Sequence, residues 1–266
     1  MAQSFDATRF FSDYMRMTGA AHLGPEKSGN PQLIGKRLGL LNGSSWITAW
    51  SNYFGRRYLP GVHLVNVGNE AVQLSFMQAH TMGLPCPPQA NIDCFVRNAI
   101  DLVELAQVTA VMITCSTMNR AYPEVARALE PYGVPVIQID QPMMERAVEI
   151  GGRTLIIATH GPTVASTQAL LQETAARLDK KIAFDGEAVE AAWEQLAEGN
   201  IAAHTQIIAD VISAKRECGF TSVVLAQLSM AAFLFSYPDP QAVFGLPVLT
   251  SGQCGFERAR EILLAC

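Results

Sequence analysis

The sequence predicts an α/β protein of two pseudo-symmetric lobes, each a mostly parallel four-stranded sheet flanked by helices. Short apolar runs, typical of buried strands, alternate along the chain with longer segments of helical periodicity. Strands that alternate with helices form right-handed βαβ units and parallel sheets. The 266 residues, 49% of them hydrophobic, are enough to build one large core or two smaller ones.

An internal repeat is the second observation that supports two lobes. A shift of 112 residues places segment 110–118 on segment 222–230, and the same shift places 133–137 on 245–249. Two separate segments that match at one offset are hard to obtain by chance. We therefore expect two similar lobes with the active site between them, where Cys115 faces Gln227.

The first half of the chain begins with an extension, residues 1–35, followed by a first lobe at 36–145. Within the extension, segment 5–17 has helical spacing, with Asp6 as a plausible N-cap. Segment 80–93 contains three prolines and is long for a connection, which is typical of a lid or binding loop. The predicted strands of this lobe are 37–42, 63–67, 108–114 and 134–139, and its predicted helices are 46–57, 95–107 and 123–129.

The second lobe is placed at residues 146–266, with a closing helix whose packing on the first lobe the sequence leaves open. Pro162 fits the first turn of a helix, where its missing N–H costs nothing. The predicted strands are 153–158, 181–184, 222–226 and 246–250, and the predicted helices are 163–178, one or two within 187–217, and 256–264.

Composition and charge argue against several classes of partner. A net charge of -5 gives no basic face for nucleic acid. We expect no membrane association, because no run of about 18 apolar residues occurs, and no secretory signal at the start. The six cysteines are irregularly spaced, so we expect free thiols in a cytoplasmic protein. No zinc or nucleotide motif is present, so we expect neither metal nor cofactor.

Three strand-end motifs occur in a fixed order: Cys115-Ser-Thr117, Ala158-Thr-His-Gly-Pro-Thr163 and Ala226-Gln-Leu228. They resemble marks of the aspartate/glutamate racemase superfamily, with one residue inserted in the second and the second cysteine missing from the third. Segment 247–253 also resembles the maleate isomerase and arylmalonate decarboxylase branches. The resemblance covers residues 36–264 and implies two α/β lobes, a small carboxylic acid as substrate, no cofactor, and a homo-oligomer, expected to be a dimer.

The resemblance implies that Cys115 is an acid/base or a nucleophile at the carbon alpha to a carboxylate. An amide cannot accept or deliver a proton at neutral pH, so Gln227 argues against ordinary two-thiol racemisation. Three chemistries remain for a lone thiol: protonation after loss of CO2, addition to a double bond, or racemisation with another acid/base in place of the second thiol. His160 is the best substitute and Cys254 a weaker one. In each case we expect helix N-termini to lower the pKa of Cys115.

Polar side chains and backbone N–H groups at the strand ends are expected to bind the substrate and to stabilise its developing negative charge. The absence of Lys and Arg from these turns suits neutral dipoles. The predicted substrate-binding residues are Asn42, Gly43, Ser44, Ser45, Ser116, Thr117, Asn119, Thr159, Thr163 and Ser229.

A structural explanation stands beside each functional one. Cys115 and Cys254 could be ordinary core thiols, Gln227 could satisfy local backbone groups, and His160 could be a capping or turn residue. Segment 42–45 could be only a turn and a cap. We place a cofactor-independent racemase or isomerase first, a one-cysteine decarboxylase or lyase second, and a non-catalytic carboxylate-binding protein third.

Overall fold

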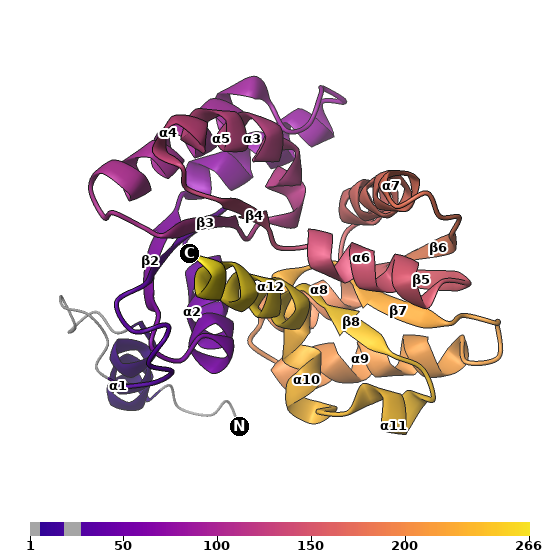
Figure 1. Ribbon diagram of the computed structural model, residues 1–266. Coiled ribbons are helices and arrows are strands. Elements are labelled where there is room, and N and C mark those ends of the chain that lie inside the picture. The colour runs from indigo at the N-terminus through magenta and orange to yellow at the C-terminus, as the bar shows by residue number, and fades with distance from the viewer. Residues whose placement is uncertain (1–5, 19–27) are drawn as a thin grey trace. The chain divides into compact units, whose positions relative to one another are not determined.

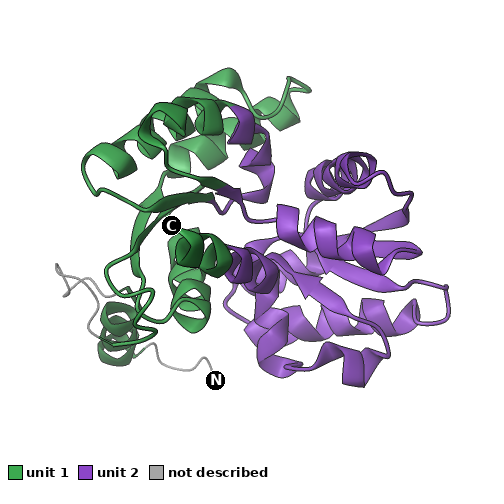
Figure 2. Ribbon diagram, viewed as in Figure 1, with its two compact units in different colours: residues 1–112, 124–136, 259–266 green, residues 113–123, 137–258 purple. Residues whose placement is uncertain are grey.

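The structure is a computed structural model that describes residues 6–18 and 28–266 (Figure 1). The chain divides into two compact units (Figure 2). The first comprises residues 1–112, 124–136 and 259–266, and the second comprises 113–123 and 137–258. None of the helices in the described part of the chain is long and apolar enough to cross a membrane.

The first sheet has four strands in the order β2-β1-β3-β4. Strands β1 and β2 run parallel, with Arg37 opposite His63. The strands are β1 (Arg37–Asn42), β2 (His63–Gly68), β3 (Ala110–Ile113) and β4 (Val136–Gln138). The helices along this half are α1 (Ala7–Thr18), α2 (Ile47–Tyr58), α3 (Glu70–Thr81), α4 (Gln89–Glu104) and α5 (Tyr122–Leu129), with short 3-10 helices η1 (Ser116–Ala121) and η2 (Glu130–Tyr132).

The second sheet has four parallel strands in the corresponding order, β6-β5-β7-β8. The strands are β5 (Arg153–Ala158), β6 (Ala183–Ala188), β7 (Ser222–Leu225) and β8 (Val248–Thr250). The helices along this half are α6 (Gln141–Ile150), α7 (Gly161–Arg177), α8 (Glu190–Ala197), α9 (Ile201–Ala214), α10 (Phe233–Ser236), α11 (Pro240–Phe244) and α12 (Ser251–Ala265), with the 3-10 helix η3 (Leu228–Ala232).

The predicted repeat is present in the backbone. Strands β3 and β7 are displaced by the predicted 112 residues, and so are the starts of β4 and β8. Gly133, which precedes β4, and Gly245, which precedes β8, both adopt left-handed backbone, with φ of 65° and 77°. Such φ values favour glycine because it has no Cβ. The predicted α/β fold with two four-stranded sheets is therefore confirmed.

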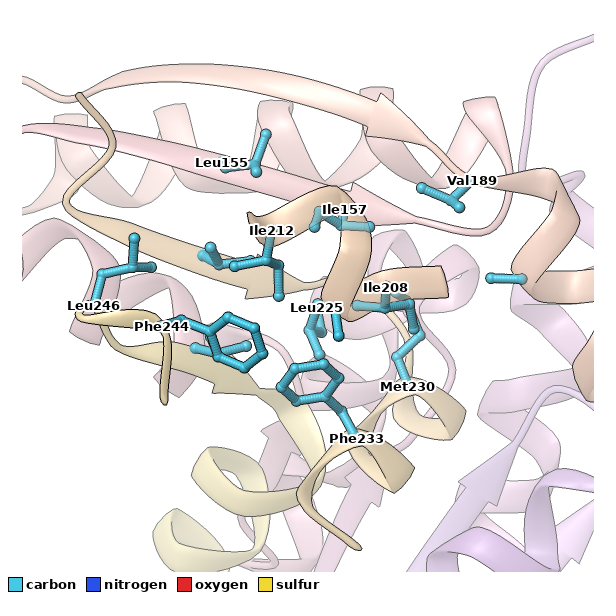
Figure 3. Close-up of a cluster of buried hydrophobic side chains, with 14 residues drawn as sticks. Leu155, Ile157, Val189, Ile208, Ile212, Leu225, Met230, Phe233, Phe244 and Leu246 are labelled. Atoms are coloured by element: carbon cyan, nitrogen blue, oxygen red, sulfur yellow. The ribbon is translucent and has the colours of Figure 1, made fainter. Parts of the chain in front are cut away.

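The core of the second unit consists of two apolar clusters, which lie on opposite faces of its sheet. Alternate side chains of a strand point to opposite faces of the sheet, so Leu155 and Ile157 join one cluster and Ile156 the other. In the first cluster, the rings of Phe233 and Phe244 lie 5.6 Å apart between centroids (Figure 3). Because both faces of β5 and β7 are buried along most of their length, residues 155–158 and 223–225 are continuous apolar runs in the sequence.

Several predicted boundaries are wrong. The predicted 80–93 loop spans only 82–88, since α3 continues to Thr81 and α4 begins at Gln89. The prolines at 85, 87 and 88 lie inside that shorter connection, and Pro88 is the N-cap of α4. Strand β6 lies at Ala183–Ala188 instead of 181–184, because this edge strand is polar and gives no apolar run. Helix α3 was not predicted.

The helix predicted in the extension is confirmed as α1. Its N-cap is confirmed as well, because Asp6 Oδ1 accepts a hydrogen bond from the Arg9 N–H at 2.9 Å. Of the predicted extension, residues 1–5 and 19–27 lie outside the described residues. Region 187–217 holds two helices, α8 and α9, separated at Gly199.

Candidate active site

Cys115 lies directly after β3, at the start of η1, in the second unit. Its backbone is extended, with φ of −106° and ψ of 113°, and its side chain is partly exposed. The thiol Sγ lies 3.1 Å from Thr117 Oγ1. The Met118 N–H donates to the Cys115 carbonyl at 3.0 Å, and the N–H groups of Thr117 and Met118 both favour the thiolate and so act to lower the pKa of Cys115. Thr117 thus places a neutral donor beside the thiol at the start of a helical turn, whereas the Ser116 hydroxyl faces Asp140.

The pKa of Cys115 is raised, which contradicts the predicted lowering. Desolvation of the sulfur is the largest cause, because burial disfavours the charged thiolate. The Thr117 hydroxyl and the two N–H groups act in the opposite direction but do not outweigh burial, and the Asp140 carboxylate raises the pKa further. Cys115 is therefore a protonated thiol at neutral pH, suited to giving up a proton and not to acting as a resting thiolate.

Asp140, after β4, is a residue that the sequence analysis missed. Only 2% of its surface is exposed, and Asn119 Nδ2 donates to its Oδ2 at 2.6 Å. Burial raises the pKa of Asp140 to about 6, although the nearby Ser116 and Ser251 hydroxyls and the Asn119 amide lower it. The sequence held a signal, since Ile137-Gln-Ile-Asp140 is another apolar run that ends in a polar group.

Gln227 follows β7 at the start of η3, in the same extended conformation as Cys115, with φ of −139° and ψ of 145°. Its Oε1 accepts hydrogen bonds from the Thr159 N–H at 2.7 Å and from the Thr159 hydroxyl at 2.8 Å. Thr159 is buried at the end of β5. Gln227 thus satisfies a backbone N–H of the neighbouring strand end instead of local backbone, and Thr159 uses its hydroxyl proton on Gln227.

His160 is the N-cap residue of α7, but its side chain makes no capping hydrogen bond. Its ring packs edge-on against Trp193, with 4.9 Å between centroids. Burial lowers the pKa of His160, while Glu190 raises it. The imidazole is therefore neutral at neutral pH. Thr163 is buried one turn into the same helix, and its N–H donates to the His160 carbonyl at 3.1 Å.

Cys254 lies buried in the first turns of α12. Burial raises its pKa to about 11, so it does not ionise at neutral pH. It lies within the apolar cluster that also holds Leu249. The structural explanation for this thiol is the better one.

Ser229, in η3, is also buried.

The remaining predicted residues, Asn42 to Ser45, belong to the first unit. Asn42 is buried at the end of β1, where its Nδ2 donates to Val67 O and its Oδ1 accepts from Ser51 Oγ at 2.6 Å. Gly43 and Ser44 are buried, and Ser45 is exposed. The Ser45 N–H donates to Glu70 Oε1 at 3.0 Å, and the Ser45 hydroxyl contacts the same oxygen. This turn therefore already holds a carboxylate from its own unit.

Metal-ligating side chains do not gather at these turns: over residues 6–18 and 28–266, no three or more His, Cys, Asp or Glu side chains form a group that could hold an ion.

Comparison with known proteins places this fold in a family. Residues 76–259, more than half of the chain, match the family model described as Asp/Glu/Hydantoin racemase. A search of curated proteins found no match. The similar solved structures include an aspartate racemase homologue from Pyrococcus horikoshii, with 16% identity, a TM-score of 0.64, and coverage of 86% of this chain and 99% of that one.

Two further structures are similar. Aspartate racemase from Picrophilus torridus has 13% identity and a TM-score of 0.65, covering 86% of this chain and 94% of that one. A variant of arylmalonate decarboxylase has 15% identity and a TM-score of 0.53, covering 85% of this chain and 93% of that one. At these identities the likeness shows the fold alone. With the family model, it confirms the resemblance carried by the three strand-end motifs: the chain belongs to the Asp/Glu/Hydantoin racemase family.

Proposed function

We propose that this protein is a cofactor-independent enzyme that delivers a proton to one face of the carbon alpha to a carboxylate, with Cys115 as the proton donor. The reaction class that fits best is decarboxylation of a small acid carrying a second carboxylate on that carbon. One observation carries the proposal: the thiol of Cys115 lies at one strand end, and the matching position of the repeat holds Gln227, whose amide cannot exchange protons.

The orientation of the Gln227 amide supports the proposal. The Thr159 N–H can only donate, so the amide atom that faces it must be the acceptor Oε1. The NH2 group then points away from Thr159, and no hydrogen-bond partner for it exists within the described residues. Gln227 therefore offers two fixed N–H donors. Such donors stabilise negative charge that develops on a substrate oxygen, and they do so without moving during the reaction.

The proposed steps conserve atoms and electrons. The bond between the alpha carbon and the leaving carboxylate breaks, CO2 departs, and its electron pair stays on the substrate as an enediolate. The N–H groups of the 115–118 turn and the amide of Gln227 are suited to stabilise the enediolate oxygens. The S–H bond of Cys115 then breaks as its proton bonds to the alpha carbon, and the thiolate regains a proton from water.

Racemisation is the second candidate, and His160 favours it. The lowered pKa of His160 makes its imidazole a free base at neutral pH, and the residue directly follows the strand end that holds Thr159. In this reaction the imidazole removes the alpha proton of an amino or dicarboxylic acid, and Cys115 protonates the opposite face. The two candidates share Cys115 and differ in whether a second group exchanges protons with the substrate.

A panel of small acids in deuterium oxide tests the proposal. Alkyl- and arylmalonates are assayed for CO2 release, and single enantiomers of aspartate and glutamate for loss of the alpha proton by NMR. We expect CO2 release and deuterium only in the product; deuterium and epimer in the unreacted amino acid would favour racemisation. Cys115→Ala should abolish the activity, whereas Cys218→Ala, which removes an exposed thiol, should not. Full activity of a folded Cys115→Ala variant would refute both candidates.

We also propose that the enzyme is a cytoplasmic homodimer. Size-exclusion chromatography with light scattering tests the oligomeric state. A single species at 28.8 kDa, the mass of one chain, would contradict a dimer.

A further inference from the structure

Two polar residues accompany the cysteine in one half of the repeat and are missing from the other. The 112-residue shift that places Cys115 on Gln227 places Asn119 on Ala231 and Asp140 on Gly252. The second half nevertheless forms the same turn, η3, and the same strand, β8. The fold therefore does not require the Asn119 and Asp140 side chains, and their presence follows that of the thiol.

Asp140 is held against the turn that carries the thiol. Asn119 lies in η1, and its Nδ2 donates to Asp140 Oδ2 at 2.6 Å. Gln138 Nε2 donates to the Asn119 carbonyl at 3.4 Å. The Ile139 N–H donates to the Ile113 carbonyl at 3.1 Å, which keeps the end of β4 beside the end of β3. Side chains at the end of β4 thus fix η1, the turn that follows the neighbouring strand β3.

The Asp140 carboxylate is buried without a cation. Its Oδ1 is inaccessible and has no hydrogen-bond partner within the described residues. The groups that face it are neutral: Ser116 and Asn119 from η1, and Ser251 from α12. Among the described titratable groups, Asp140 is the one whose charge acts on Cys115. A buried carboxylate without a compensating charge is unfavourable for folding, and such groups cluster at functional sites.

We propose that Asp140 is a positioning residue for Cys115: through its hydrogen bond with Asn119 it fixes the 115–121 turn, and it places a buried carboxylate against that turn. The inference rests on the proposed role of Cys115 as a proton donor and adds how the thiol returns to its protonated form after each reaction. A thiolate formed beside a carboxylate is unfavourable, so after each proton transfer the charge repulsion drives Cys115 to recover a proton from water.

The test is the pH dependence of Cys115 alkylation by iodoacetamide, measured in the full chain by mass spectrometry of the peptide that contains Cys115. The thiolate is the reacting form, so the rate reports its population. Asp140→Asn keeps the shape and the contact with Asn119 but removes the charge. We expect its alkylation midpoint to move to lower pH and its rate at neutral pH to rise. Asp210→Asn, on the exposed side of α9, should match wild type. An unchanged or higher midpoint in folded Asp140→Asn overturns the inference.

Wild-type protein provides a second test if Asp140→Asn does not fold. Because Asp140 ionises at about pH 6, the logarithm of the alkylation rate should rise less steeply through that pH than above or below it. A constant slope of one across that region overturns the inference. Neither readout requires a substrate. A shifted midpoint without turnover of any acid would refute the proposed function alone, and turnover without a shift would refute this inference alone.

Discussion

The turn after β3 and the turn after β7 have the same backbone and different chemistry. Each begins with an extended residue, continues as a 3-10 helix, and is followed by a strand displaced by 112 residues. One carries a protonated thiol supported by Asn119 and Asp140. The other carries Gln227, whose acceptor is bound to Thr159. The repeat therefore duplicates the scaffold that presents a side chain, whereas one of the two copies presents a thiol and the other an amide.

The largest loss of turnover is predicted for a substitution that removes the acid, Cys115, from the turn after β3. Cys115→Ser keeps the size of the side chain but replaces the thiol with a much weaker acid. We expect turnover to fall by about 10²- to 10⁴-fold, the usual contribution of a positioned acid. Cys254→Ser, which changes a buried thiol outside these turns, should retain turnover. Equal losses in the two variants would show that Cys115 has no special role.

The next effect concerns the amide in the second turn. Gln227→Glu keeps an oxygen that accepts from Thr159 but replaces the outward NH2 donor with a carboxylate oxygen. We expect turnover to fall by about 10²- to 10³-fold, as when one donor to a developing negative charge is lost. Steady-state kinetics measure the loss, and a matched Gln206→Glu change on α9 controls for added charge. Turnover equal to wild type in Gln227→Glu would contradict the role given to this amide.

The third effect is on stability. The pKa of Asp140 in the folded protein, about 6, lies above its usual value of 3.8, so its contribution is favourable below pH 3.8 and is lost as the pH rises through 6. Ionised Asp140 thus costs up to about 3 kcal/mol at higher pH. Asp140→Asn should raise the free energy of unfolding by up to that amount above pH 6 and by little in acid, as measured by urea denaturation.

Asp185→Asn provides the comparison for that measurement. Asp185 pairs with Arg153 at the surface, where such pairs are worth about 0–1 kcal/mol. A loss of stability in Asp140→Asn above pH 6 would show that the buried charge is compensated by groups other than the neutral ones that face it.

The smallest effect separates the hydroxyls of the two turns. Thr117 Oγ1 lies 3.1 Å from the thiol and favours the thiolate, whereas the repeat places the buried Ser229 at the matching position beside Gln227. Thr117→Val should slow Cys115 alkylation by about fivefold, which corresponds to one hydrogen bond of ~1 kcal/mol. Ser229→Ala should leave the rate unchanged. An alkylation rate in Thr117→Val equal to that of wild type would show that the Thr117 hydroxyl does not stabilise the thiolate.

Strands that are buried on both faces of their sheet were predicted best. Strands β1 and β5 have the predicted bounds, because a buried apolar run, 38–41 and 155–158 respectively, forms the centre of each. The edge strand β6 was misplaced, since Asp185 and Glu187 break its pattern. Prolines suggested a loop at 80–93, but local composition does not show that the segment after Pro88 is helical and packs its Ile92 into a core.

The positions of Cys115 and Gln227 at matching strand ends were predicted, but the electrostatics of these turns were not. The repeat located Cys115 and Gln227 because matching strand ends can be aligned in sequence. The pKa of Cys115 was predicted in the wrong direction because burial is a tertiary property that the turn sequence does not contain. Asp140 was missed because its contact with Asn119 joins residues 21 positions apart.

The product formed in deuterium oxide tests the central claim most directly. One acid on one face predicts that wild-type enzyme and Gln227→Ala both convert a prochiral disubstituted malonate into a single enantiomer with one alpha deuterium, however far their rates differ. A racemic product, or deuterium returned to a chiral substrate together with its epimer, would contradict the account, because either result requires a second group that exchanges protons on the opposite face.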